Sequence, residues 1–229
     1  MKKHKVFVAI DTSKISVAKK IIKETRNSSI SIIPKFGMQF FYAKKNRTFL
    51  EKLNTEFFLD LKIADVPATA LAAMDSLKDI KKIRWITAHA NGGYEMLKAI
   101  NKKAKKINKK IFVLGVSILT SLDNKSVREL GHTKTVKKLV LKQAGIIKRS
   151  GCKGIIASAE EAQFIKKKYK NLFVVTPGIR FSGDSKNDQK RVVTPRDALI
   201  VKKADAIVMG RSLTGNIKKN LKKLIQSLN

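Results

Sequence analysis

The sequence predicts a (β/α)8 TIM barrel, a single domain that takes up all of residues 1–229. Two observations lead to this fold class. Short apolar segments alternate along the chain with longer segments of helical period, which is typical of successive βα units. In addition, no linker, low-complexity tract or change in composition divides the chain. A doubly wound open sheet, built from the same units, is the alternative arrangement.

The predicted strands are short and rich in β-branched and aromatic residues, as strands buried between helical layers usually are. In order they are KVFVAID (5–11), SISIIPKF (29–36), EFFLDLKI (56–63), IRWITAHA (83–90), KIFVLGVSI (110–118), GIIAS (154–158), LFVVTPGI (172–179) and AIVMG (206–210). Their number, eight, is the number that closes such a barrel. The amphipathic stretches between them that are long enough for a crossover helix include residues 15–24, 67–82, 92–107 and 135–150.

Composition indicates a globular protein of the cytoplasm. Hydrophobic residues make up 43% of the chain, which is enough for a sizeable core. No apolar run approaches the roughly 18 residues of a membrane span, and the first apolar stretch is only five residues long before Asp11 interrupts it. The single cysteine, Cys152, cannot form an internal disulfide, which agrees with a reducing compartment. We therefore expect a cytoplasmic protein without a signal peptide.

The formal net charge of +33 is of the kind found on nucleic-acid-binding surfaces, but its distribution argues against that function. Lysine outnumbers arginine by 41 to 9, and the lysines are spread over many segments. Aromatic residues are not interleaved with basic ones as they are in surfaces that stack bases. We expect the charge to help attract a phosphorylated substrate, without specific binding of nucleic acid.

Polar residues follow most of the predicted strands. In a barrel of this type the C-terminal ends of the strands converge on one face, where the active site lies. The residues at or just beyond those ends are Asp11, Lys35, Asp60, Lys62, His89, Thr120, Ser158, Arg180, Gly210 and Arg211. A barrel without a site would not need so many charges on one face, so the pattern predicts a site for a charged small molecule.

The third predicted strand carries charges inside an apolar run. Because side chains of a strand alternate between its faces, Leu59, Leu61 and Ile63 share the face toward the helices. Asp60 and Lys62 then point into the barrel mouth, about 6 to 7 Å apart along the strand. A neighbouring carboxylate favours the charged form of a lysine, so we expect Lys62 to be held as a protonated acid.

Two further charges extend this pattern. Lys35 ends the second predicted strand, and Asp65 follows the third, just before Pro67, whose ring suits the first turn of a helix. Lys35, Asp60, Lys62 and Asp65 are therefore expected to form an alternating array of charges, which is costly to assemble unless a substrate uses it. The alternative is an internal salt bridge that only closes the barrel mouth.

The loops after the last two strands have the composition of a phosphate site. Loops at this place commonly bind phosphate, because glycine lets backbone N–H groups approach and arginine supplies a planar pair of donors. Gly178 and Arg180 lie at the end of the seventh predicted strand, and Gly210 and Arg211 at the end of the eighth. The polar stretch 181–190 is predicted to be a lid over the phosphate.

The segment DLKIADVPAT (60–69) resembles the D-x-K-x-x-D motif of the orotidine 5′-phosphate decarboxylase family. Similar segments follow in the family's order and spacing: VAIDTS, PKFGMQFF, ITAHANGG, SILTSL, TPGIR, DQKRVVTP and IVMGRSLT. The resemblance covers nearly the whole chain. It implies a homodimeric (β/α)8 barrel that converts orotidine 5′-monophosphate to uridine 5′-monophosphate and CO2 in pyrimidine biosynthesis, with no metal and no organic cofactor.

The resemblance also implies roles for individual residues. Lys62 would deliver a proton to C6 of the pyrimidine, and Asp60 would lie beside the substrate carboxylate. Asp65 and Thr69 would reach into the site of the neighbouring subunit, where Asp65 completes the charge array and Thr69 contacts the ribose region.

Other residues would hold the substrate. Asp11 and Lys35 would bind ribose hydroxyls, and Thr120 would hydrogen-bond the pyrimidine. The residues that would bind the phosphate or hold its loop are Arg180, Gln189, Gly210 and Arg211.

Two departures from the family pattern and one related group qualify this interpretation. The family often has His at the position of Ala64 and Asn at that of Ala68, which affects packing and loop hydrogen bonds near the dimer face. Sugar-phosphate decarboxylases and synthases of the same barrel superfamily share the aspartate-lysine-aspartate motif and need magnesium to stabilise an enediolate. They lack the LTS segment and the Pro-x-Thr tail found here, and loss of activity with a chelator would favour them.

Overall fold

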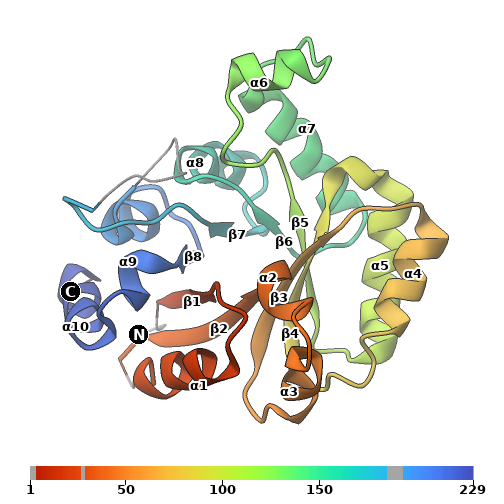
Figure 1. Cartoon of the computed structure of the whole chain (residues 1–229). Helices are drawn as coiled ribbons and strands as arrows, with labels where there is room; N and C mark the ends of the chain where they lie inside the picture. Colours follow the sequence, from red (N-terminus) through yellow and green to blue (C-terminus); the bar gives the residue numbers. More distant parts are fainter. Residues whose placement is uncertain (1–3, 27–28, 185–192, 229) are drawn as a thin grey trace.

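The strands of the computed structural model, which describes residues 4–26, 29–184 and 193–228, form a closed barrel of eight parallel strands wrapped by helices (Figure 1). Each strand pairs with the next in the sequence, and β1 pairs with β8 to close the ring. The predicted TIM barrel is therefore confirmed, and the open sheet is excluded.

The strands follow the apolar segments of the sequence. Their bounds are β1 (Lys5–Ile10), β2 (Ser31–Gly37), β3 (Phe57–Ile63), β4 (Ile83–His89), β5 (Phe112–Val116), β6 (Gly154–Ile156), β7 (Phe173–Thr176) and β8 (Ala206–Met209). Several are shorter than predicted, because residues past their C-terminal ends leave the ladder and enter the loops that form the site.

The helices lie outside the barrel, most of them between consecutive strands (Figure 1). The α-helices are α1 (Ile15–Glu24), α2 (Met38–Phe41), α3 (Asn46–Lys52), α4 (Pro67–Asp75), α5 (Gly93–Ile107), α6 (Asn124–Glu129), α7 (Val136–Arg149), α8 (Ala159–Lys168), α9 (Arg211–Thr214) and α10 (Ile217–Leu228). A 3-10 helix, η1 (Ala90–Gly92), precedes α5, and a π-helix, η2 (Asp197–Val201), precedes β8.

One predicted helix ends early. The amphipathic stretch 67–82 forms α4 only as far as Asp75, and turns follow. The Ser76 hydroxyl donates a 2.7 Å hydrogen bond to the carbonyl of Ala73, and the next N–H groups bond three residues back instead of four. A serine side chain that bonds the backbone in this way competes with helix continuation.

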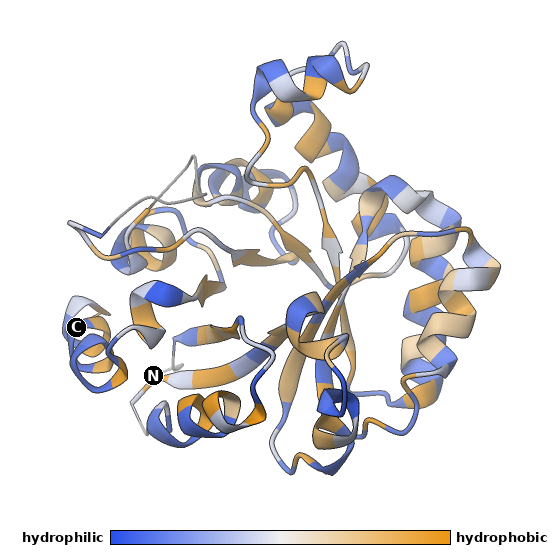
Figure 2. Cartoon of the chain, in the orientation of Figure 1, coloured by the Kyte–Doolittle hydropathy of each residue, from blue (hydrophilic) through white to orange (hydrophobic). Residues whose placement is uncertain are grey.

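Alternation along the strands separates two apolar layers. In β1, Val6, Val8 and Ile10 pack in the core between strands and helices, whereas Phe7 and Ala9 pack inside the barrel. In Figure 2 the strands are largely apolar, and the helices combine an apolar side with a hydrophilic one. This is the pattern expected when helices cover the outside of a barrel.

Aromatic side chains fill the interior of the barrel below the site. Phe7 lies against Phe58 and Trp85, with ring centroids 4.9 and 5.2 Å apart in edge-to-face geometry. All three are buried. The barrel is thus a packed core, and the space for a ligand lies at the C-terminal ends of the strands. In the part of the chain that the structure describes, no helix has the length and apolar character needed to span a membrane.

Candidate active site

A cavity of about 250 Å³ opens at the C-terminal ends of the strands. It is lined from β1, β2, β3, β5, β6 and β8 and from the segments that follow β1, β5, β7 and β8. The predicted site residues on its wall are Asp11, Lys35, Asp60, Lys62, Thr120, Arg180, Gly210 and Arg211. Residues far apart in the sequence therefore meet in one pocket, as strand-end reasoning predicted.

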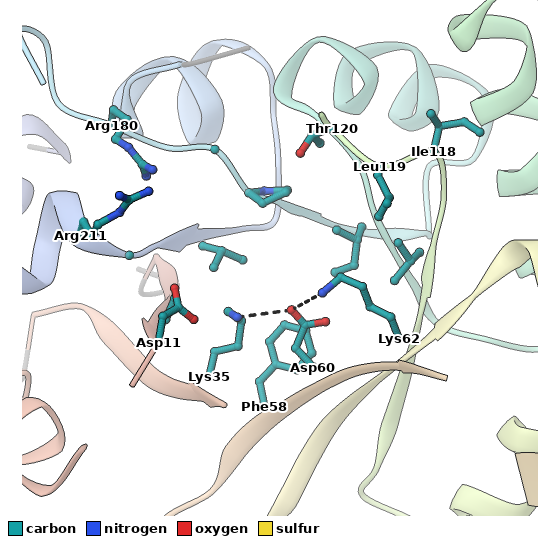
Figure 3. Close-up of a pocket in the computed structure, with 17 residues that line it drawn as sticks. Asp11, Lys35, Phe58, Asp60, Lys62, Ile118, Leu119, Thr120, Arg180 and Arg211 are labelled. Atoms are coloured by element: carbon teal, nitrogen blue, oxygen red, sulfur yellow. Dashed lines mark hydrogen bonds and ion pairs between the residues drawn. The ribbon is translucent and has the colours of Figure 1, made fainter. Parts of the chain in front are cut away.

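Asp60 lies between two ammonium groups at the bottom of this pocket (Figure 3). Its Oδ2 is 3.0 Å from Lys62 Nζ and 3.3 Å from Lys35 Nζ. Its Oδ1 accepts a 2.9 Å hydrogen bond from the hydroxyl of Thr87. The side chains of Lys35 and Asp60 are only 9% and 13% exposed, so this is a nearly buried carboxylate with both oxygens in use.

The charge of Asp60 is maintained by its neighbours. Burial by itself would raise the pKa of the Asp60 carboxyl, because it disfavours the ionised form. The positive charges of Lys35 and Lys62 and the hydrogen bonds from Lys62 and Thr87 outweigh that effect and lower the pKa below 3.8. Asp60 is therefore a carboxylate at neutral pH, and it orients Lys62 Nζ toward the pocket.

The backbone at Lys62 is unusual for a strand. Its φ is +50°, in the left-handed region that non-glycine residues rarely occupy, which costs of order 1–3 kcal/mol. The pairing of β3 with β4 shifts register here, since Leu59 lies opposite Ile86 while Ile63 lies opposite Ala88. The side-chain alternation predicted for 59–63 is nevertheless present: Leu59, Leu61 and Ile63 contact the outer core, and Lys62 faces the cavity.

The opposite end of the pocket carries two guanidinium groups, those of Arg180 and Arg211 (Figure 3). Arg180 is buried, and its Nη1 donates a 3.0 Å hydrogen bond to the carbonyl of Ile179. Its Nε is buried without a hydrogen-bond partner among the described residues. A buried donor of this kind is expected to be satisfied by a ligand, and an oxyanion fits it.

The loop after β7 is shaped to bring these groups together. Gly178, on the pocket wall, has a φ of +76°, a conformation that favours glycine. The Phe181 N–H donates a 3.2 Å hydrogen bond to Ser212 Oγ, which ties the loop to α9, and another of 3.2 Å to Asp184 Oδ2 within the loop. Gly210 lies in the same wall, and a Cβ there would come within 3.6 Å of an Asp11 carboxylate oxygen.

An apolar wall also lines the pocket. Its members are Phe58, Val116, Ile118, Leu119 and Ile156. These residues were not predicted to belong to the site, although strand alternation places Val116 and Ile156 on the inner faces of β5 and β6. Such a wall suits a flat ring, with polar groups at both ends to orient it.

Asp65 and Thr69 do not join this pocket. Both are exposed, and both line a second cavity of about 430 Å³ together with Tyr42. Asp65 Oδ1 accepts a 2.7 Å hydrogen bond from the N–H of Val66. Within one chain the predicted array thus assembles Lys35, Asp60 and Lys62, and leaves Asp65 outside.

The remaining predicted residues have other positions. Ser158 does not line the pocket but caps α8, where its hydroxyl and the Glu161 carboxylate bond each other's backbone N–H groups. His89 Nδ1 accepts a hydrogen bond from the Asn91 N–H, and burial, followed by the charge of Lys62, lowers the pKa of His89. Gln189 and most of the predicted lid lie outside the described residues.

Among the residues that the structure describes, no three or more His, Cys, Asp or Glu side chains are grouped so that they could hold a metal ion. The charged groups of the pocket are instead mostly lysine and arginine. This composition complements a substrate with several negative charges.

Known proteins resemble this chain over nearly its full length. The profile of the Orotidine 5'-phosphate decarboxylase / HUMPS family matches residues 4–222. The orotidine 5'-phosphate decarboxylase of Carboxydothermus hydrogenoformans is 36% identical over 216 residues, which cover 91% of this chain and 88% of that protein. The one of Coxiella burnetii is 34% identical over 216 residues, covering 92% and 89%.

Solved structures agree with the sequence relatives. Orotidine 5'-phosphate decarboxylase from Lactobacillus acidophilus superposes with a TM-score of 0.80 at 26% identity, covering 99% of this chain and 100% of that one. An uncharacterised conserved protein from Geobacillus kaustophilus superposes with a TM-score of 0.79, also at 26% identity, over 98% and 100%. From the profile match, the identity to curated relatives and the barrel itself, it follows that this chain belongs to the orotidine 5'-phosphate decarboxylase / HUMPS family.

Proposed function

We propose that this protein decarboxylates orotidine 5′-monophosphate to uridine 5′-monophosphate, with Lys62 as the proton donor. The observation that carries the proposal is the position of Asp60, within 3.0 Å of Lys62 Nζ and 3.3 Å of Lys35 Nζ at the bottom of the pocket. Family membership supports it, as do the names of two similar relatives. The arginine end of the same pocket supports a phosphorylated substrate.

The chemistry needs a preformed positive charge at the reacting carbon. When the bond between C6 and the carboxylate breaks, the electron pair stays on C6 without a conjugated sink, so the barrier falls only if charge is already in place. The Lys62 ammonium group supplies that charge and then transfers a proton to C6. Asp60 repels the substrate carboxylate, and this repulsion disappears as CO2 leaves.

The rest of the substrate would bind along the cavity. Asp11 and Lys35 would hold the ribose hydroxyls, and Thr120 would hydrogen-bond the pyrimidine at the apolar wall. The phosphate would bind at the other end, where Arg180, Gln189, Gly210 and Arg211 are the proposed ligands. Binding energy from that remote group would order the site and increase the rate of the chemical step.

A direct assay tests the reaction. Purified protein is mixed with orotidine 5′-monophosphate, and the loss of its ultraviolet absorbance is followed with and without EDTA. We expect turnover that is unaffected by EDTA. Turnover of a 3-keto sugar phosphate that EDTA abolishes, with none of orotidine 5′-monophosphate, would instead assign the chain to the magnesium-dependent branch of the superfamily.

We further propose a homodimer in which Asp65 and Thr69 enter the partner's pocket. Both side chains are exposed and line a cavity together with Tyr42. Tyr42 and Val66 are 71% and 62% exposed, and Met38 is 47% exposed. Large exposed apolar side chains of this kind are typical of a protein interface.

Subunit mixing tests this arrangement. Lys62→Ala and Asp65→Asn should each be inactive alone. If Asp65 acts across the interface, a mixed dimer has one site that holds both native residues, so mixing the two variants should restore about a quarter of the wild-type activity. No recovery, with mixed dimers demonstrated by native mass spectrometry, would place Asp65 in its own subunit's site. An Asp65→Asn variant that is active alone would place Asp65 outside catalysis.

A further inference from the structure

We infer that Thr87 is a positioning residue for the proton-transfer pair and acts through its hydroxyl group without touching the substrate; this inference rests on the proposed function. Thr87 is fully buried in β4 and does not line the pocket. Its hydroxyl contacts both partners of the pair. It accepts a 2.8 Å hydrogen bond from the backbone N–H of Lys62, and it donates a 2.9 Å hydrogen bond to Asp60 Oδ1.

The chemistry of the three groups leaves one arrangement of these bonds. An ionised carboxylate can only accept, and a backbone N–H can only donate. The hydroxyl of Thr87 therefore uses its proton toward Asp60 and a lone pair toward Lys62. A single hydroxyl fixes the side chain of one residue and the main chain of the other, so their relative position depends on it.

The local strand pairing explains why the Thr87 side chain binds the backbone N–H of Lys62. Between the pairs Leu59–Ile86 and Ile63–Ala88, the three residues 60–62 of β3 face the single residue Thr87 of β4. In this register the Lys62 N–H bonds the side chain of Thr87. The backbone of Lys62 is also held at a φ of +50°, which needs support from its surroundings.

The shape of the position does not require threonine. Valine has the same shape and an equal preference for strands, and it would suit a fully buried site in a barrel. A buried hydroxyl with both its donor and its acceptor engaged by the two residues of the reacting pair indicates a role in their geometry.

The test compares Thr87→Val, which removes the hydroxyl at nearly constant shape, with Thr87→Ser, which retains it. We expect Thr87→Val to lower kcat by about 10- to 100-fold through misplacement of Lys62, with KM changed less than about threefold, because the phosphate contacts are remote. Thr87→Ser should stay within about threefold of the wild-type kcat. Thr176→Val is the matched control, since Thr176 is also fully buried at a strand end but its hydroxyl has no hydrogen-bond partner among the described residues.

Several outcomes would overturn the inference: an unchanged kcat in Thr87→Val, an equal loss in Thr176→Val, or a Thr87→Ser variant as impaired as Thr87→Val. Should Thr87→Val not fold, Thr87→Ala gives the same comparison with less bulk. Amide hydrogen exchange at Lys62 gives a readout that needs no activity. The amide should be protected in the wild type and Thr87→Ser and exchange at least about tenfold faster in Thr87→Val or Thr87→Ala.

A wild-type protein without turnover would refute the proposed function, whereas equal exchange rates in all variants would refute the role of Thr87.

Discussion

The charge of Asp60 should matter for stability as well as for chemistry, and Asp60→Asn isolates it. Asparagine keeps the shape of the side chain and one acceptor oxygen but removes the negative charge between Lys35 and Lys62. The native carboxylate lies 3.3 and 3.0 Å from their ammonium groups. We expect the variant to unfold more easily than the wild type at pH 7.

The size of the effect follows from burial. At an effective dielectric constant of about 20, each pair gains about 5 kcal/mol of Coulomb energy at these separations, most of it offset by desolvation. The Lys62 side chain is 32% exposed and can turn to water, whereas that of Lys35 is 9% exposed and cannot. In Asp60→Asn, the Lys35 ammonium group is therefore the one buried charge left without a counterion. We expect the free energy of unfolding to fall by about 3 kcal/mol, the lower end of the range for such cases. For a chain of this length the melting temperature should fall by about 6–12 °C.

A double-mutant cycle measures the coupling. The free energies of urea unfolding are compared for wild type, Asp60→Asn, Lys35→Met and the double variant. Because Lys35→Met removes the stranded charge, the double variant should be more stable than Asp60→Asn, with a coupling energy of about 2 kcal/mol. Glu24→Gln is a control, since Glu24 pairs with Lys20 at 3.9 Å with both side chains well exposed, and its loss should cost less than about 0.5 kcal/mol.

Two results would refute this reasoning. If Asp60→Asn were as stable as the wild type or more stable, the buried pair would be a net cost that the fold carries for function. If the effects of Asp60→Asn and Lys35→Met were additive, the two charges would not depend on each other.

Three further predictions concern activity and pH. Lys62→Ala should abolish measurable turnover while uridine 5′-monophosphate still binds within about tenfold of the wild-type affinity by calorimetry; retained turnover would exclude Lys62 as the proton donor. Arg211→Ala should raise KM by about 100-fold, equivalent to about 2.7 kcal/mol, with a smaller change in kcat, and an unchanged KM would place the phosphate elsewhere. The pKa of Asp60 is lowered in the folded protein, so native Asp60 binds protons less readily than unfolded Asp60. The stability that its charge contributes is therefore complete above the unfolded pKa of about 3.8 and is lost as the pH falls through the folded pKa. The stability difference between the wild type and Asp60→Asn should therefore be constant above about pH 5 and shrink below pH 3.8; a difference independent of pH would contradict the shift.

Much of the barrel follows from local patterns in the sequence. Period-2 and period-3.6 patterns predicted the strands and the main crossover helices, including α1 at residues 15–24. Strand alternation likewise predicted that the Lys62 side chain points into the mouth of the barrel. These features depend on residues within one or two turns of each other, so the sequence contains all the necessary information.

Other features depend on which residues meet across the fold. The end of α4 at Asp75 depends on side-chain hydrogen bonding that an amphipathic pattern does not reveal. Ser158 was expected at the pocket, but it caps the N-terminus of α8. Thr87 gave no signal, because a threonine in a strand is ordinary until its partners are known. Val116 and Ile156, the members of the apolar wall that come from β5 and β6, were likewise not distinguishable from core residues.

Local patterns were enough to predict that strands and helices alternate around a barrel and that acidic and basic side chains end the strands on one face, because hydrophobic period and strand direction are local properties. Tertiary structure alone decided that residues 60–62 of β3 bulge opposite a single residue of β4, that Lys62 takes a left-handed backbone conformation, and that the Thr87 hydroxyl joins it to Asp60. A register shift is set by how two strands 25 residues apart pack together, and no pattern within either strand specifies it.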